Sequence, residues 1–243
     1  MGCALSLDGV LVWRAIPSAD SPFAAKGYDL PAIVASEVAL RDRGRWALRS
    51  VTLSAGHEAT GIAGRRGAGK TALLALLAGL VAPARGELSV LGQDLRTCGG
   101  RGAIQGRVGL VPPPGRPGGF TVAGLVTHAA WLMRLPASLR AARVASALER
   151  LSLPGWAGSP VTAVPEHVAR RAWLAACTVH QPELLLVDGL LDGVTDDDAQ
   201  TLATCLRNLA ANWPIVVAGR DHTRLSLCCP RVLSLHDGTA CGG

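Results

Sequence analysis

Eight residues, Gly64-Arg65-Arg66-Gly67-Ala68-Gly69-Lys70-Thr71, have the residue types and spacing of a phosphate-binding loop. They match the pattern G-x-x-x-x-G-K-[ST], in which backbone N–H groups surround phosphate, the lysine reaches the β- and γ-phosphates and the hydroxyl coordinates Mg²⁺. Of the 24 lysine and arginine residues, only Lys26 and Lys70 are lysines, which makes a lysine at this position informative. The alternative is a glycine-rich surface turn, but the pattern favours a nucleoside triphosphate site.

A carboxylate that could share Mg²⁺ with Thr71 lies far along the chain, at Asp188. Asp188 follows four consecutive aliphatic residues, 184–187, as a magnesium-associated carboxylate does at the end of a buried strand. The alternative is an ordinary turn residue after a strand. Together with the loop, the pattern predicts a metal pair of Thr71 and Asp188.

The elements around these residues must bring the two motifs together. A strand over 58–63 leads into the glycines and a helix over 70–80 follows them, which is the context that a phosphate-binding loop requires. Periodicity predicts helices over 121–153, 166–179 and 198–211, and strands over 38–40, 50–53, 86–91, 107–111, 184–188, 215–218 and 232–235. Alternating strands and helices predict an α/β fold with a parallel sheet and an inserted helical block. Residues 1–34 lack such periodicity and contain three prolines, so we expect an irregular arm there.

Composition excludes several other classes of protein. The net charge of +6 is spread along the chain without interleaved aromatic residues, which argues against nucleic-acid binding. Seven scattered cysteines include no C-x-x-C pair, so neither a zinc site nor a disulfide framework is indicated. The longest apolar stretch, 72–84, is too short to span a bilayer.

About residues 35–243 resemble the nucleotide-binding domain of ATP-binding cassette (ABC) transporters. The similarity lies in the loop with its following helix, in the second nucleotide motif His180 to Asp188 and in the closing strand Arg231 to Gly238. It implies a P-loop NTPase (RecA-like) core sheet, a small N-terminal β-subdomain and an α-helical subdomain at about 119–181. It also implies that ATP and Mg²⁺ are bound, with the nucleotide held by Gly64, Arg65, Arg66, Gly67, Ala68, Gly69, Lys70, Thr71 and Ala72, and the metal by Thr71 and Asp188.

The same resemblance implies partners and a location. Such a subunit docks onto an integral membrane permease at the cytoplasmic face of the cell membrane and forms a homo- or heterodimer with another nucleotide-binding domain. A non-transport protein that senses ATP or acts as a scaffold is the alternative. A P-loop kinase is disfavoured by the second motif and the closing strand.

Departures from the family pattern concern hydrolysis. The glutamine that senses Mg²⁺ falls on Pro113, the glutamate that polarises water on Gly189, and the switch histidine on Arg220, with His222 as an alternative. The signature Leu-Ser-Gly-Gly-Gln falls near 164–168, where Glu166 would bring negative charge towards a triphosphate. The aromatic residue that stacks on adenine falls near Asp42, with Trp46 as a possible stand-in. Asp192 and Asp196 to Asp198 are carboxylates near Gly189, and we expect them to be solvated loop acids. We therefore expect ATP binding with attenuated hydrolysis, and no catalytic residue beyond the weak candidates Arg220 and His222.

Overall fold

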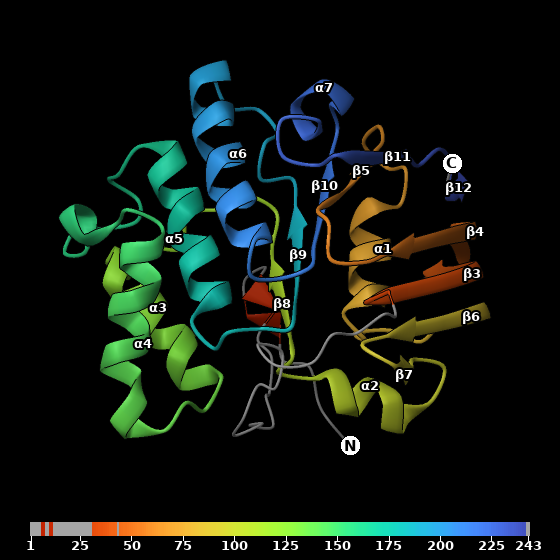
Figure 1. Ribbon diagram of the computed structural model, residues 1–243, viewed down its shortest axis with the longest axis horizontal. Coiled ribbons are helices and arrows are strands. Elements are labelled where there is room, and N and C mark those ends of the chain that lie inside the picture. Colours follow the sequence, from red (N-terminus) through yellow and green to blue (C-terminus); the bar gives the residue numbers. More distant parts are fainter. Residues whose placement is uncertain (1–5, 8–9, 12–30, 43, 242–243) are drawn as a thin grey trace.

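A computed structural model describes residues 6–7, 10–11, 31–42 and 44–241 of the chain. Its centre is a parallel sheet of five strands in the order β11-β5-β10-β9-β8 (Figure 1). The strands are β5 (Thr60–Ala63), β8 (Val108–Val111), β9 (Leu184–Asp188), β10 (Ile215–Gly219) and β11 (Arg231–Ser234). The three central strands, β5, β10 and β9, are buried along their whole length, as expected for a parallel sheet covered on both faces.

The two faces of this sheet belong to two hydrophobic cores. Leu185 and Val187 of β9 pack with one set of helices, whereas Leu184 and Leu186 pack with α1 (Lys70–Leu77) and the second sheet. This division follows from the alternation of side chains along a strand. Figure 1 shows α5 and α6 on one side of the sheet and α1 on the other.

A second sheet flanks α1, with the order β12-β4-β3-β6-β7. It consists of β3 (Ile33–Asp42), β4 (Arg45–Ala55), β6 (Arg85–Val90), β7 (Gln93–Asp94) and β12 (Thr239–Cys241). β3 pairs antiparallel with both β4 and β6, and β12 adds a parallel edge to β4. The predicted strands 38–40 and 50–53 are therefore only the middle parts of β3 and β4, whose ends carry exposed and charged residues that hide the strand pattern.

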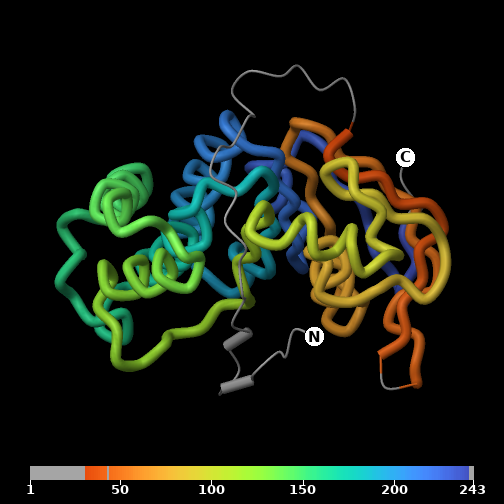
Figure 2. Tube along the Cα trace, turned by 90° about the horizontal axis from the view of Figure 1, so that it is seen from below, coloured from red at the N-terminus to blue at the C-terminus, as the bar shows by residue number. Residues whose placement is uncertain are grey.

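A helical layer packs on the face of the central sheet that carries Leu185 and Val187. It contains α3 (Val122–Leu132), α4 (Ala137–Arg150), the short 3₁₀ helix η2 (Pro154–Trp156) and α5 (Glu166–Thr178), which join α6 (Asp196–Ala210). The predicted helical stretch 121–153 is two helices, because Pro136 caps the start of α4. In Figure 2 the helical layer lies at one end of the molecule and the second sheet lies at the other.

Three helices differ from the predictions. α1 ends at Leu77 rather than near residue 80, and Gly79 follows with a positive φ of 72°. α2 (Cys98–Ile104) was not predicted, because its glycine-rich sequence has low helix propensity. The Thr97 side chain caps its start by accepting a hydrogen bond from the Gly100 N–H. α7 (His222–Leu225) was also not predicted.

The expectation of a wholly irregular arm over 1–34 is wrong in the described part of that stretch. β1 (Ser6–Leu7) pairs antiparallel with β2 (Val10–Leu11), and β3 already begins at Ile33. The rest of the predicted arm, up to residue 30, lies outside the described residues. In the described part of the chain, no helix combines the length and the hydropathy needed to cross a membrane.

Candidate functional site

The predicted phosphate-binding loop connects the buried strand β5 to the start of α1. Gly67 and Gly69 have φ values of 85° and 102°, in the left-handed region that favours glycine. A Cβ on Gly69 would lie 2.6 Å from the carbonyl oxygen of Ala47, and one on Gly64 would lie 2.6 Å from that of Leu235. Glycine is therefore required at positions 64 and 69 by the close approach of other backbone segments.

Lys70 is the first residue of α1 and is buried, with 9% of its surface exposed. Its Nζ donates hydrogen bonds to the carbonyl oxygens of Gly64 at 2.6 Å and Arg65 at 3.0 Å. Burial lowers the pKa of Lys70, and the charges of Asp192 and Asp188 oppose that shift. The ammonium group is thus held inside the loop by two backbone acceptors.

Thr71 and Asp188 meet directly, although 117 residues separate them. Thr71 Oγ1 donates a hydrogen bond of 2.6 Å to Asp188 Oδ2. Sheet register explains the meeting, because β10 pairs in parallel with both β5 and β9 and so aligns their carboxyl ends. Burial raises the pKa of Asp188, while the Thr71 hydrogen bond and the Lys70 charge act in the opposite direction.

This pair fits a magnesium ion that binds together with a substrate phosphate. Mg²⁺ is usually held by one or two protein oxygens, with phosphate and water completing its octahedron. Thr71 and Asp188 supply a hydroxyl and a carboxylate oxygen at one point of the cleft. Among the described residues no group of three His, Cys, Asp or Glu side chains could hold a metal ion.

A cleft of about 760 Å³ opens beside this pair. Residues from both sheets, the loop and α5 line it: Leu40, Arg41, Asp42, Arg66, Gly67, Gly69, Lys70, Thr71, Ala72, Ala75, Val81, Pro113, Pro114, Arg170, Asp188, Gly189, Asp192 and Arg220. Of the nine predicted nucleotide residues, only Gly64, Arg65 and Ala68 do not line it. Arg65 and Ala68 instead line a smaller cavity of about 330 Å³ with His236 and Asp237.

Three of the departures from the family pattern also line this cleft. Pro113 lies in it, and Gly189 follows Asp188 with a φ of 65°. Arg220 lies at the carboxyl end of β10, whereas His222 is exposed on α7 and is not part of the cleft lining. The structure therefore favours Arg220 over His222 as a residue of this site.

Glu166, at the start of α5, does not present the unpaired negative charge that the sequence suggested. Its carboxylate accepts hydrogen bonds from Arg170 Nε at 2.8 Å and from Arg116 Nη2 at 2.9 Å. Burial would raise the pKa of Glu166, but these hydrogen bonds and charges outweigh it and lower the pKa. Arg116 also donates to the carbonyl oxygens of Thr162 and Val164, so the α5 start is closed by internal contacts.

Trp46, the predicted stand-in for an adenine-stacking aromatic, is not among the residues that line the cleft. Arg41 and Asp42 line this end instead. The Arg41 guanidinium carbon lies 4.4 Å from the centroid of the Trp46 ring. Trp46 therefore supports a cleft residue by a cation–π contact rather than reaching the cleft itself.

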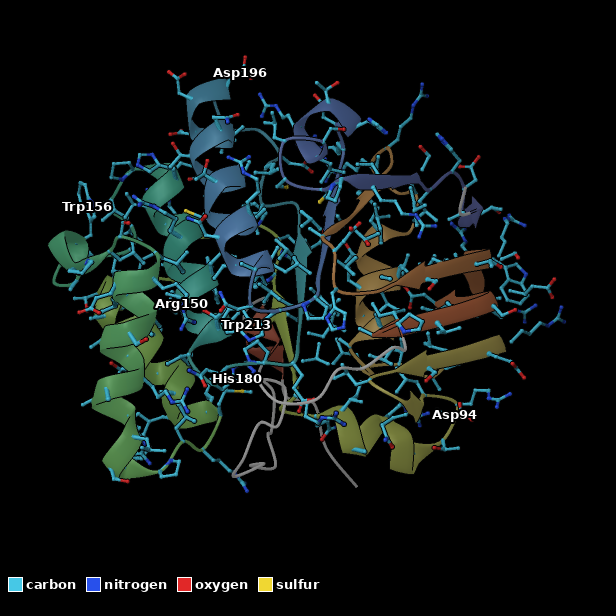
Figure 3. The ribbon with its side chains drawn as sticks, viewed as in Figure 1. Asp94, Arg150, Trp156, His180, Asp196 and Trp213 are labelled. Carbon is cyan, nitrogen blue, oxygen red and sulfur yellow. The ribbon has the colours of Figure 1, made fainter. Side chains whose placement is uncertain are left out.

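Asp192 is a carboxylate that the sequence interpretation considered and set aside as a solvated loop acid. Its side chain is only 16% exposed, so the expectation of a solvated loop acid is wrong. Its carboxylate accepts hydrogen bonds from the Arg220 backbone N–H and Nε. Asp196, by contrast, fits the expectation, since its side chain is 95% exposed at the outer end of α6 (Figure 3). The sequence shows Asp192 four residues after Asp188, but it gives no sign that this carboxylate lies against Arg220.

Comparisons with known proteins agree with this geometry. A family model described as ABC transporter matches residues 49–191. The phosphonates import ATP-binding protein PhnC of Pseudomonas entomophila is 31% identical over 218 residues, covering 83% of this chain and 82% of that protein. The methionine import ATP-binding protein MetN of Caulobacter vibrioides is 32% identical over 202 residues, covering 80% of this chain. The match spans only 60% of the length of the methionine import protein.

Among solved structures, cbiO1 from Clostridium perfringens, part of the ABC transporter complex cbiONQ, has a TM-score of 0.78. It shares 21% sequence identity and the match covers 88% of both chains. The dimeric ATP-binding cassette MJ0796 bound to ADP and phosphate has a TM-score of 0.72 at 18% identity. These likenesses confirm the predicted P-loop NTPase fold.

Proposed function

This chain belongs to the ABC transporter family, and we propose that it is an ATP-binding subunit of a transport system that binds Mg-ATP and hydrolyses it slowly. The observation that carries the proposal is the convergence of the loop, Lys70 and the Thr71–Asp188 pair on one cleft, with Gly189 immediately after Asp188. The first three features are those of a triphosphate site, and the fourth removes a side chain where the family carries a carboxylate.

The loop would hold the phosphates through its backbone N–H groups and the positive end of α1. Lys70 would exchange its present acceptors, the carbonyl oxygens of Gly64 and Arg65, for phosphate oxygens. Thr71 and Asp188 would hold Mg²⁺, which when bound neutralises charge on the phosphates. The loop, Lys70, Thr71 and Asp188 are all present, so we expect binding to survive the substitutions.

Slow hydrolysis follows from two substitutions. Gly189 offers no carboxylate, and losing a general base commonly lowers a rate by about 10²- to 10⁴-fold. At the start of α5, Pro165 has no N–H, and the Glu166 carboxylate is already hydrogen-bonded to Arg116 and Arg170. Losing one donor that stabilises transition-state charge costs about 10²- to 10³-fold more. The signature of each protomer faces the triphosphate of the other protomer, so we expect the two effects to combine in a homodimer of this chain.

The proposed partner is an integral membrane permease, with the chain bound peripherally at the cytoplasmic face of the membrane and paired with a second nucleotide-binding domain. We propose residues 35–243 as the nucleotide-binding domain and about 119–181 as its helical subdomain. The closed α5 start also favours a second function, an ATP sensor or scaffold without transport. Co-purification with a membrane permease would favour transport, and a stable complex without one would favour the sensor.

The test is ATP affinity of the pure chain, measured by calorimetry with and without Mg²⁺. We expect Lys70→Ala to abolish binding, since it removes the buried ammonium group of the loop. Arg96→Ala is the matched control, because it also removes one positive charge but from an exposed ion pair with Asp94. Equal affinity of wild type and Lys70→Ala would refute the ATP site, and fast magnesium-dependent turnover would refute slow hydrolysis.

A further inference from the structure

The carboxylate of Asp192 lies beside Gly189. A Cβ placed on Gly189 would lie 3.4 Å from Cδ of Pro114 and 3.6 Å from Oδ2 of Asp192. In a glutamate side chain, the carboxylate oxygens lie about 3 to 4 Å from Cβ, as bond lengths require. Asp192 therefore puts an oxygen at a distance from position 189 that a glutamate at 189 would itself reach.

The loop that carries Asp192 is fixed by hydrogen bonds. The backbone N–H of Asp192 donates to the carbonyl oxygen of Gly189 at 3.1 Å. The carbonyl oxygen of Asp192 accepts a hydrogen bond from Arg170 Nη1 at 2.8 Å. Arg170 also donates to the carbonyl oxygen of Leu190. The buried guanidinium thus holds the turn 189–192 against α5.

The Asp192 carboxylate is also held in place. Arg220 donates from its backbone N–H to Oδ1 at 2.9 Å and from Nε to Oδ2 at 3.2 Å. Because Arg220 directly follows β10 and Asp192 lies shortly after β9, the parallel pairing of these strands sets this contact. A carboxylate with two donors of one residue is pre-positioned at the cleft wall, as a catalytic group must be.

Asp192 lies among the residues that would hold the phosphates and the metal. It lines the cleft together with Lys70, Thr71 and Asp188. Its carboxylate is therefore placed at the phosphate end of the cleft.

We propose that Asp192 is the carboxylate that accepts the proton of the attacking water in the slow hydrolysis of ATP by this chain. The proposal rests on the proposed function and adds a catalytic residue to it. As the water oxygen bonds to the γ-phosphorus, one water proton passes to Asp192 and the bond from the γ-phosphorus to the bridging oxygen breaks. ADP leaves with that oxygen, and Asp192 returns its proton to solvent, so one ATP and one water yield ADP, phosphate and a proton.

The same geometry explains why this reaction would be slow. Asp192 has a shorter side chain than glutamate and comes from a position three residues later than 189. Both of its oxygens already accept hydrogen bonds from Arg220. Water must therefore share the carboxylate with Arg220, which weakens the proton transfer without abolishing it.

The test is Asp192→Asn in the full chain, with ATP affinity and single-turnover phosphate release measured separately. The amide keeps the shape of the side chain but cannot accept the proton. We expect phosphate release to fall at least tenfold while ATP affinity stays equal or increases, because a negative charge beside the triphosphate is removed. Asp192→Glu should keep more activity than Asp192→Asn, and the rate of Lys70→Ala serves as the background.

Asp197→Asn is the matched control, because it removes an exposed carboxylate from the start of α6 and should leave both quantities unchanged. A variant Asp192→Asn that hydrolyses ATP as fast as wild type would overturn the proposal. So would a wild-type chain that binds ATP but releases no phosphate above the Lys70→Ala background, although ATP binding would then stand. A parallel loss of affinity and rate in Asp192→Asn would instead show a structural role and also overturn it.

Discussion

Restoring a glutamate by Gly189→Glu tests the site most directly, and the structure predicts that the substitution is costly. The φ of 65° at Gly189 lies in the left-handed region, where an L-residue loses about 1 to 2 kcal/mol. The new carboxylate would also lie near Oδ2 of Asp192, which is 3.6 Å from the Cβ position. Two like charges about 4 Å apart repel by about 4 kcal/mol at an effective dielectric constant of about 20, and by less where water enters the cleft.

We therefore expect Gly189→Glu to lower the free energy of unfolding by about 2 to 5 kcal/mol in the nucleotide-free protein. Gly189→Ala isolates the backbone contribution and should cost about 1 to 2 kcal/mol, since a Cβ meets only ordinary contacts there. The assay is urea unfolding of both variants, each made also in an Asp192→Asn background. In that background Gly189→Glu should cost at least 1 kcal/mol less, because the repulsion is gone.

Hydrolysis should follow the same coupling. Gly189→Glu alone should raise phosphate release by less than it does in the Asp192→Asn background, since one carboxylate disturbs the other. Equal destabilisation by Gly189→Glu in both backgrounds would refute the reasoning, because it would mean that the carboxylates at 189 and 192 do not meet.

Two further predictions concern buried polar groups. Burial lowers the pKa of His180 from its ordinary 6.5 to about 4, so the unfolded chain binds more protons between these values and stability falls as the pH drops through that window. We expect a loss of about 2 kcal/mol between pH 7.5 and pH 5, seen by urea unfolding, which His180→Leu should remove; an unchanged pH dependence in His180→Leu would contradict the assignment. Arg170→Met should lower the free energy of unfolding by about 3 kcal/mol, because it leaves Glu166 and the carbonyl oxygens of Leu190 and Asp192 without their buried donor. Arg96→Met, which breaks an exposed pair, should lower stability far less than Arg170→Met in thermal unfolding, and an equal cost would contradict the burial argument.

The sequence predicted those parts of the site that depend on local pattern. The loop from Gly64 to Thr71 is contiguous, and its glycines and lysine have fixed spacing, so their roles follow from the chain itself. β9 was predicted with its observed bounds, because five consecutive buried residues flanked by Pro182 and Gly189 have no competing interpretation. β3 and β4 were predicted too short, since exposed charges at their ends break the alternation.

Other parts depend on contacts between distant segments and could not be read from local pattern. The charge on Glu166 is balanced by Arg116, which lies 50 residues earlier in a proline-rich connection. Trp46 was assigned to the base end of the cleft because it is aromatic, but its ring instead packs against Arg41. In both cases the sequence shows the residue type but does not show which distant residue it contacts.

Asp192 shows most clearly why such contacts decide the chemistry. Taken as part of a loop with Asp196, Asp197 and Asp198, it is one of several acids before a helix, and solvation is the reasonable expectation for all of them. The pairing of β9 with β10 brings it to Arg220, and its carboxylate lies 3.6 Å from the position of a Cβ on Gly189. The substitution that removes a carboxylate from position 189 and the contact that supplies one from position 192 therefore belong to the same arrangement. A missing glutamate at position 189 therefore does not mean that the site lacks a carboxylate, because a residue of the following loop can supply one.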